Sequence, residues 1–318
     1  MGATVVTASG DIVSTSEKEN SELLWALRGG GGNFAVVTEF VFGLYDQRPD
    51  IYHAQFIFRP TALGPIMMEV NAWLADRTVL ETGALMFFND PTNRPLLLMH
   101  LLYNGDAKEG EERFTRFTKL EPESYEARSI SYLEANRMLD IPSMHGDSRI
   151  KRGHFVPAVS AGIPFKLVEN TFEVWHKLMQ DHPAANQSFV MWEFYGTEKW
   201  SKVPRDATAY FHRSPTYNLN SIVRWADPTF AAHALLIAKD FDTAFIQTRA
   251  GLFKPELLAE GGYANYRDED ARNSNDVMLH KRFGSNYGKL VEVKTKYDPN
   301  NLFCKWFGIP PRHVAKAI

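Results

Sequence analysis

The chain has 318 residues, of which 44% are hydrophobic and 23% charged, and its formal net charge at pH 7 is −3. That length suffices for one or two domains with a buried core. The small net charge argues against a nucleic acid or an anionic membrane as partner. The single cysteine, Cys304, excludes an internal disulfide, and no apolar run is long enough to span a bilayer. The histidines show no metal-ligand spacing, so no metal site is predicted.

The N-terminal part is predicted to form a small piece of mixed α and β structure. Strands are expected at 4–8 and 12–14, joined by a turn, and a buried strand is expected at 34–42. Ser16 and Glu19 have the spacing of a capping box, which predicts that a helix begins there. The segment does not have the pattern of a signal peptide. Because the chain opens directly on an apolar strand, we expect partner strands of the same domain upstream of it.

The middle of the chain is predicted to contain apolar strands and amphipathic helices. The expected strands are 51–58, 83–88, 96–103, 188–195 and 217–225. The expected helices are 65–75, 110–117, 164–182, 228–248 and 255–260. The basic cluster Arg149–Arg152 is expected to be a solvated loop. A last helix at 286–296 should end before Pro299, which cannot continue it.

This order of elements predicts an α+β fold in three segments. Residues 1–48 would be the C-terminal portion of one domain, and residues 271–318 would return to that domain and end in a tail. Residues 49–270 would form a second domain, in which helices cover an antiparallel sheet.

Four consecutive glycines, Gly29–Gly32, lie between the first predicted helix and the buried strand. Such a run lets the backbone approach a ligand closely and can point several N–H groups in one direction, as a flavin or a pyrophosphate requires. A plain helix cap with a tight turn explains one glycine well but four poorly. On the glycines alone, both interpretations stand.

Two asparagines, Asn218 and Asn220, lie two residues apart on a predicted strand and therefore share one face. A carboxamide can orient a ligand but cannot act as a general base, and a half-exposed polar strand face explains the pair equally well. Glu193 is either a base with a raised pKa or an outward-facing residue, and the second interpretation is favoured. His212, next to Arg213, is more typical of a hydrogen-bonded structural residue than of a catalytic acid or base.

Three segments carry a resemblance to a known family. The string Leu-Trp-Ala-Leu-Arg-Gly-Gly-Gly-Gly-Asn-Phe-Ala-Val-Val-Thr, at 24–38, resembles a signature of the FAD-linked oxidases related to berberine bridge enzyme. The family usually has Gly where this chain has Ala35. Residues 262–268 resemble the Asn-Tyr-Arg-Asp block of that family, and residues 283–303 resemble its C-terminal block from Asn-Tyr to Tyr-Asp-Pro and Asn-Leu-Phe. A weaker similarity covers 203–225.

The resemblance implies FAD as cofactor. The cofactor-binding residues that it implies are Gly30, Gly31, Gly32, Asn33, Phe34, Val37, Asn286 and Tyr287. In the family, a further upstream region holds the adenine and the pyrophosphate and supplies the residues that bond covalently to the flavin. The resemblance therefore makes 1–48 and 271–318 a remnant of the FAD-binding domain and 49–270 the substrate domain. It names no covalent flavin ligand in this chain, and Cys304 does not match the flavin-linked cysteine of the family.

The resemblance also implies where the substrate lies. A tyrosine at the position of Tyr266 faces the substrate in the family. The strand face of Asn218 and Asn220 carries a Glu, Gln or Lys in relatives, and that residue serves proton transfer. Because this chain has asparagine at both positions, Tyr266 or Tyr287 would be the base if one is needed. The implied catalytic residues are Tyr266, Asn220, Asn218 and Tyr287.

The activity that the resemblance implies is oxidation of a small organic molecule, of the kind found in secondary metabolism. A hydride would pass to the flavin, and dioxygen would take up the electrons. One alternative is a flavin-free cyclase or isomerase that keeps the substrate pocket and acts by holding a reactive conformer. Another is a non-catalytic, truncated homologue. A small molecule is the expected partner, and relatives of this kind are often secreted.

Overall fold

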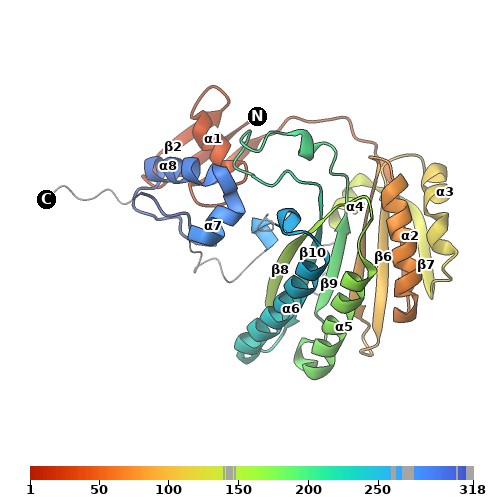
Figure 1. The fold of residues 1–318 in the computed structure, drawn as a ribbon. Helices are drawn as coiled ribbons and strands as arrows, with labels where there is room; N and C mark the ends of the chain where they lie inside the picture. Colours follow the sequence, from red (N-terminus) through yellow and green to blue (C-terminus); the bar gives the residue numbers. More distant parts are fainter. Residues whose placement is uncertain are drawn as a thin grey trace. The chain divides into compact units, whose positions relative to one another are not determined.

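The structure is a computed structural model that describes residues 1–312 apart from 139, 141–145, 147, 259–262, 267–275 and 306. The chain forms two compact units. Unit 1 comprises Met1–Asp46, Lys199–Ser214 and Ala259–Ile318, and unit 2 comprises Gln47–Glu198 and Pro215–Leu258. Both combine helices with antiparallel sheet, so the predicted α+β class is confirmed (Figure 1).

Unit 1 is built around a three-stranded antiparallel sheet with the order β2-β1-β3. Its strands are β1 (Gly2–Thr7), β2 (Ile12–Ser16) and β3 (Ala35–Val41), and its helices are α1 (Ser21–Leu27), α7 (Asp276–Phe283) and α8 (Tyr287–Tyr297). Its core joins residues from all three parts of the unit. Val5, Leu23, Phe34, Ala209 and Leu290 are each fully buried there. Unit 1 therefore has a core of its own, which consists of segments far apart in the sequence.

Two expectations for the N-terminal part were wrong. Helix α1 begins at Ser21, after Asn20, and not at Ser16. The Ser16 side chain instead accepts hydrogen bonds from the backbone N–H of Lys18 and Glu19, which makes a local turn at the end of β2. Strand β3 is largely exposed and not buried, because within the described part of unit 1 only one face of the sheet has a core against it.

Unit 2 contains a seven-stranded sheet in which every neighbouring pair is antiparallel, with the order β7-β4-β6-β5-β9-β10-β8. The strands are β4 (Asp50–Phe58), β5 (Glu81–Asn89), β6 (Pro95–Tyr103), β7 (Ser124–Ser131), β8 (Ser148–Pro157), β9 (Phe189–Phe194) and β10 (Thr216–Trp225). The five strands predicted from the sequence are all present, and β7 and β8 were not predicted.

Four helices lie along one face of this sheet (Figure 1). They are α2 (Leu63–Asp76), α3 (Ala107–Thr118), α5 (Phe165–Asp181) and α6 (Ala231–Leu252). Their apolar residues form one core with alternate residues of the strands, as side-chain alternation in a sheet requires. A short helix α4 (Tyr132–Arg137) follows β7. Single 3-10 turns occupy Pro60–Ala62, Pro183–Ala185, Trp200–Lys202, Pro228–Phe230, Pro255–Leu258, Ala264–Tyr266 and Gly284–Asn286.

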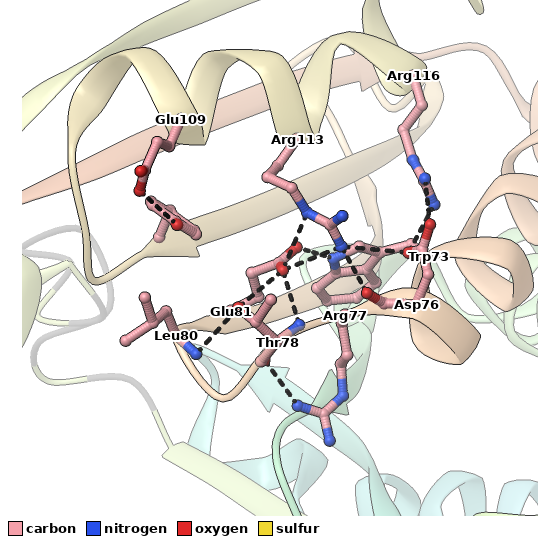
Figure 2. A network of polar contacts seen from close by, with 10 residues as sticks. Trp73, Asp76, Arg77, Thr78, Leu80, Glu81, Glu109, Arg113 and Arg116 are labelled. Carbon is pink, nitrogen blue, oxygen red and sulfur yellow. Dashed lines mark hydrogen bonds and ion pairs between the residues drawn. The ribbon is translucent and has the colours of Figure 1, made fainter.

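A buried carboxylate anchors α2 and α3 to the end of β5 (Figure 2). Glu81 accepts hydrogen bonds from Trp73 Nε1 at 2.7 Å, from the backbone N–H of Thr78 at 2.8 Å and from Arg113 Nε at 3.1 Å. Arg113 also contacts the carboxylate of Asp76 at the end of α2. Because every partner is a donor, the carboxylate is compensated in its apolar surroundings.

The prediction of a solvated loop at the basic cluster Arg149–Arg152 was wrong, because this segment lies in β8. Arg152 is fully buried, and its Nε lies 3.4 Å from Oδ2 of Asp242 on α6. His154 reaches the other carboxylate oxygen of Asp242 at 2.6 Å. The carboxylate on α6 thus explains why basic side chains are tolerated inside this edge strand.

The units differ from the predicted segments 1–48, 49–270 and 271–318 in two respects. The part of Ala259–Ile318 before residue 271 and the segment Lys199–Ser214 were both expected in the middle segment but belong to unit 1. Lys199–Ser214 joins unit 1 through contacts with α1, in which the backbone N–H of Ala209 donates to the Trp25 carbonyl at 3.1 Å.

Within the described residues, none of the helices combines the length and the apolar character needed to cross a membrane.

Candidate functional site

The glycine loop of unit 1 is shaped mainly by close packing against its own unit. A Cβ at Gly29 would lie 2.2 Å from the backbone N of Tyr210, and one at Gly31 would lie 2.6 Å from the Phe307 ring. A Cβ at Gly30 would lie 2.6 Å from a carbonyl of α1. Gly29 and Gly31 also have positive φ values of 131° and 73°, which disfavour other residues. Three of the four glycines are therefore explained without a ligand.

Gly32 is the exception, because it is exposed and a Cβ there would meet nothing within 4 Å. The backbone N–H groups of Gly31 and Gly32 donate to no acceptor among the described residues. Adjacent N–H donors on an open glycine backbone are suited to a phosphate or to a carbonyl edge. This part of the loop fits the predicted role in binding FAD.

A buried ion pair on α8 braces the loop. Lys294 Nζ donates to the carbonyl of Asn33 at 2.8 Å, to Asp298 Oδ2 at 2.6 Å and to the carbonyl of Phe303 at 2.8 Å. Burial lowers the pKa of Lys294. Burial acts on Asp298 in the opposite sense, but the Lys294 ammonium and two backbone N–H donors outweigh it, so the pKa of Asp298 is lowered. This pair was not predicted from the sequence, although Lys294 in the last turn of the predicted helix and Asp298 just beyond its end have i,i+4 spacing.

Three of the predicted cofactor-binding residues follow the loop into β3. The side chain of Asn33 is almost fully buried, and it donates to the carbonyl of Gly30 at 2.8 Å and accepts from the N–H of Ile309 at 2.9 Å. Phe34 is fully buried in the core of unit 1, and Val37 is half-buried on β3. Asn33 and Phe34 thus shape the loop, and contact of these residues with a cofactor stays a prediction.

The other two predicted cofactor residues lie at the start of α8. Asn286 occupies the N-cap position, but its side chain does not cap the helix. Its Nδ2 donates instead to the carbonyls of Arg205 and Thr208, at 2.7 and 3.1 Å. The Tyr287 ring is buried, and its centroid lies 4.6 Å from that of His280. Asn286 therefore ties the segment that contains 205–208 to α8 within unit 1.

Tyr266 ends a short 3-10 turn in unit 1. Its ring packs edge-on against Tyr263, with the centroids 4.8 Å apart. Within the predicted block 262–268, residues 262, 267 and 268 lie outside the described residues. His212 is buried, and its ring centroid lies 5.9 Å from that of Tyr210.

In unit 2, polar side chains gather on the sheet face that points away from α2, α3, α5 and α6. We call this the polar face and define it by Gln55, His100, Glu193, Asn218 and Asn220. Leu219 and Val223 of β10 belong to the core on the helix side, so their neighbours Asn218 and Asn220 point to the polar face. The expected common face of the two asparagines agrees with this register.

Glu193 of β9 lies directly opposite Asn218 of β10. Asn218 Nδ2 donates to Glu193 Oε2 at 3.1 Å. Asn218 is buried and Glu193 is half-buried. Asn218 and Asn220 offer no base on this face. The pairing of β9 with β10 places the carboxylate of Glu193 on the same face. The signal was a charged residue within an apolar strand, but its partner could be known only from the pairing of β9 with β10.

Asn220 is fully buried, and neither Nδ2 nor Oδ1 has a hydrogen-bond partner among the described residues. A buried polar group without a partner costs about 1–3 kcal/mol. Such a group is rare in native proteins unless an ordered water, an ion or a ligand satisfies it. Asn220 is therefore the residue of unit 2 whose environment most clearly calls for a ligand.

A histidine pair lies on the same face, on the other side of β5. His53 Nε2 and His100 Nδ1 are 3.0 Å apart. Burial lowers the pKa of both imidazoles, and together with His53 it brings the pKa of His100 to about 4. Both rings are thus neutral at pH 7. Ala84 of β5 pairs with both His100 and Glu193 and leaves only a methyl group between them.

Metal ligation is not indicated by the described residues, since they contain no group of three or more His, Cys, Asp or Glu side chains that could hold an ion. The described residues provide two other features: a glycine loop in unit 1 with N–H groups that have no acceptor among them, and the polar face in unit 2. The first is suited to an anionic or carbonyl-bearing group, and the second to a small molecule with hydrogen-bonding groups.

The chain is similar to several known proteins. Residues 262–310 match the family described as "Berberine and berberine like". The chain is 27% identical to FAD-linked oxidoreductase pgmH of Aspergillus terreus, with 98% of the chain and 64% of that protein covered. It is 26% identical to glucooligosaccharide oxidase of Sarocladium strictum, with 98% of the chain and 63% of that protein covered. The chain thus spans less than two thirds of the length of either relative.

Solved structures show the same fold at lower identity. The BBE-like protein 28 of Arabidopsis thaliana superposes with a TM-score of 0.76 at 21% identity, and covers 98% of the chain. A chitooligosaccharide oxidase superposes with a TM-score of 0.75 at 20% identity and also covers 98% of the chain. The chain covers 66% of each of these two structures.

Proposed function

We propose that this chain, which belongs to the berberine-bridge-enzyme-like family of FAD-linked oxidoreductases, contributes the substrate site and part of the flavin site of an enzyme that oxidises a small organic molecule. FAD, when bound, supplies the acceptor for a hydride from the substrate, and dioxygen is the proposed final acceptor. A secondary metabolite is the proposed substrate, as the family resemblance implies.

Unit 1 would hold the flavin at its glycine loop. The free N–H groups of Gly31 and Gly32 are the donors offered to it, and Lys294 keeps the end of the loop in place through the Asn33 carbonyl. Asn286 and Tyr287, at the start of α8, complete the proposed cofactor residues. Phe34 and Val37 support the loop from β3.

Unit 2 would carry the proton chemistry on its polar face. Glu193 is the proposed acceptor of the substrate proton, because Asn218 and Asn220 cannot act as bases. Asn218 would fix the orientation of the Glu193 carboxylate through the 3.1 Å hydrogen bond from its Nδ2. Asn220 would bind the substrate. Tyr266 remains a proposed catalytic residue on the family resemblance alone.

The observation that carries this proposal is the Glu193–Asn218 pair beside the unpartnered carboxamide of Asn220. It supports an oxidoreductase with a base better than the flavin-free cyclase, which would need only an orienting group. If the cyclase or isomerase reading is right, a product will form without FAD and without oxygen uptake.

The test is peroxide release by the FAD-loaded protein with a panel of alcohols, amines and cyclic amides. Glu193→Gln should lower kcat by about 10²–10⁴-fold, the usual contribution of a general base, with flavin content unchanged. Glu126→Gln is the matched control, since Glu126 is an exposed carboxylate on the edge strand β7 and should keep kcat within about twofold. Equal activity of Glu193→Gln and the native protein would remove Glu193 from the mechanism.

A further inference from the structure

The surroundings of Asn220 describe the group that it would bind. Across the sheet, Asn220 pairs with Met191 of β9 and Gly153 of β8, and Met191 in turn pairs with Met86 of β5. Opposite residues in such a row have their Cβ atoms about 4.5–5.5 Å apart. No member of this row other than Asn220 has a polar side chain, so the row itself cannot satisfy the carboxamide.

The neighbours of Asn220 on the polar face are small or apolar. Gly153, opposite Asn220 on the edge strand β8, has no side chain. Phe155, two residues further along β8, points to the same face and pairs with Asn218. The residues around Asn220 on this face thus include an aromatic ring and the thioether of Met191, both of which suit a flat apolar body.

The carboxamide presents a donor and an acceptor side by side in one plane. An ionised carboxylate only accepts and an ammonium only donates, so either would leave one half of Asn220 unsatisfied. A charged ligand would also be buried here without a countercharge in the row, which is costly. A group that complements both atoms at once is a planar pair of one donor and one acceptor, such as the N–H and C=O of a lactam; asparagine pairs in the same two-point way with the edge of adenine.

We infer that Asn220 recognises a cyclic amide, so that the substrate of the polar face is a neutral, flat molecule carrying a lactam. The two hydrogen bonds run from Asn220 Nδ2 to the lactam carbonyl and from the lactam N–H to Asn220 Oδ1. This inference rests on the proposed function for the claim that the ligand is a substrate, but the recognition itself requires neither flavin nor turnover.

The test is binding of 2-quinolone and of N-methyl-2-quinolone to the full chain without added FAD, followed by calorimetry or saturation-transfer NMR. The two probes share one ring system, and only the first has the N–H donor. We expect 2-quinolone to bind at least tenfold more tightly. We expect Asn220→Leu to abolish that preference and Asn136→Leu to keep it, because Asn136 is an exposed asparagine on α4 whose side chain donates to the carbonyl of Tyr132.

Three results would overturn the inference: equal affinity for the two probes, an unchanged preference in Asn220→Leu, or no saturable binding of either probe. Cooperative melting of each variant shows that it is folded, and Asn220→Ala replaces the leucine variant if the latter is not. Because the measurement uses no flavin, loss of the lactam preference leaves the oxidoreductase proposal standing. Conversely, failure to bind FAD leaves the lactam preference measurable.

Discussion

Asn33 and Asn220 are both buried asparagines, yet their carboxamides are in opposite situations. Asn33 uses its side-chain donor and acceptor inside unit 1, whereas Asn220 uses neither. The buried Asn220 carboxamide has lost its hydrogen bonds to water and gained none in the protein. Because leucine has no polar group to desolvate, we expect Asn220→Leu to raise the free energy of unfolding by about 1–2 kcal/mol. Asn33→Leu, the matched control, should lower it by about 2 kcal/mol or more, because it leaves the carbonyl of Gly30 and the N–H of Ile309 without partners.

Chemical denaturation of the two variants and the native protein measures both effects. A loss of stability in Asn220→Leu as large as that in Asn33→Leu would mean that the Asn220 carboxamide is satisfied in the folded protein. The case for a ligand at that position would then fail.

At the residue scale, the sequence predicts what depends on local geometry and misses what depends on pairing. The common face of Asn218 and Asn220 follows from side-chain alternation within one strand. The partnership of Glu193 with Asn218 depends on the register between β9 and β10, which no local pattern encodes. The same limit explains why the Lys294 contact with the Asn33 carbonyl, across more than 250 positions of sequence, was not predicted.

At the scale of elements, helix α8 is held to the glycine loop by Lys294 and Asp298, both of whose side chains are fully buried. Asp298→Asn would leave a buried ammonium without its countercharge, and we expect a loss of about 3–5 kcal/mol. Glu292→Gln, on the same helix, breaks an exposed pair with Arg312 and should cost no more than about 0.5 kcal/mol.

The pH dependence provides a second measure of the same pair. Because the pKa of Asp298 is lowered in the folded protein, its contribution is fully present above the unfolded pKa of about 4 and is lost as the pH falls through the folded pKa. The difference in stability between the native protein and Asp298→Asn should therefore shrink as the pH falls below about 4. A difference that does not change with pH would show that Asp298 is not ionised in the fold.

The strands that were not predicted, β7 and β8, are the two edges of the seven-stranded sheet. Their sequences, Ser-Tyr-Glu-Ala-Arg-Ser-Ile-Ser and Ser-Arg-Ile-Lys-Arg-Gly-His-Phe-Val-Pro, contain charged residues. Edge strands commonly carry charges, which discourage pairing with another chain and weaken the apolar alternation. The inner strands are apolar on the helix side, and the sequence predicts all of them.

At the scale of the whole molecule, two compact units are formed from interleaved segments of the chain. The sequence predicts that the N- and C-terminal parts belong together only through the family resemblance. It does not predict that Lys199–Ser214 joins them, because the contacts that hold this segment, such as the one from Trp25 Nε1 to the Asp206 carbonyl at 2.7 Å, are tertiary.

The glycine loop of this chain is proposed to contribute to an FAD site. The most direct measurement is the visible absorption of the 318-residue protein after incubation with FAD and gel filtration, beside that of Gly32→Val. Gly32 has open space around it, so the variant should melt like the native protein. If the glycine loop binds FAD, we expect flavin absorbance to elute with the native protein and to be lost in Gly32→Val. A native protein that melts cooperatively but retains no flavin, or a variant that retains as much as the native protein, would contradict it.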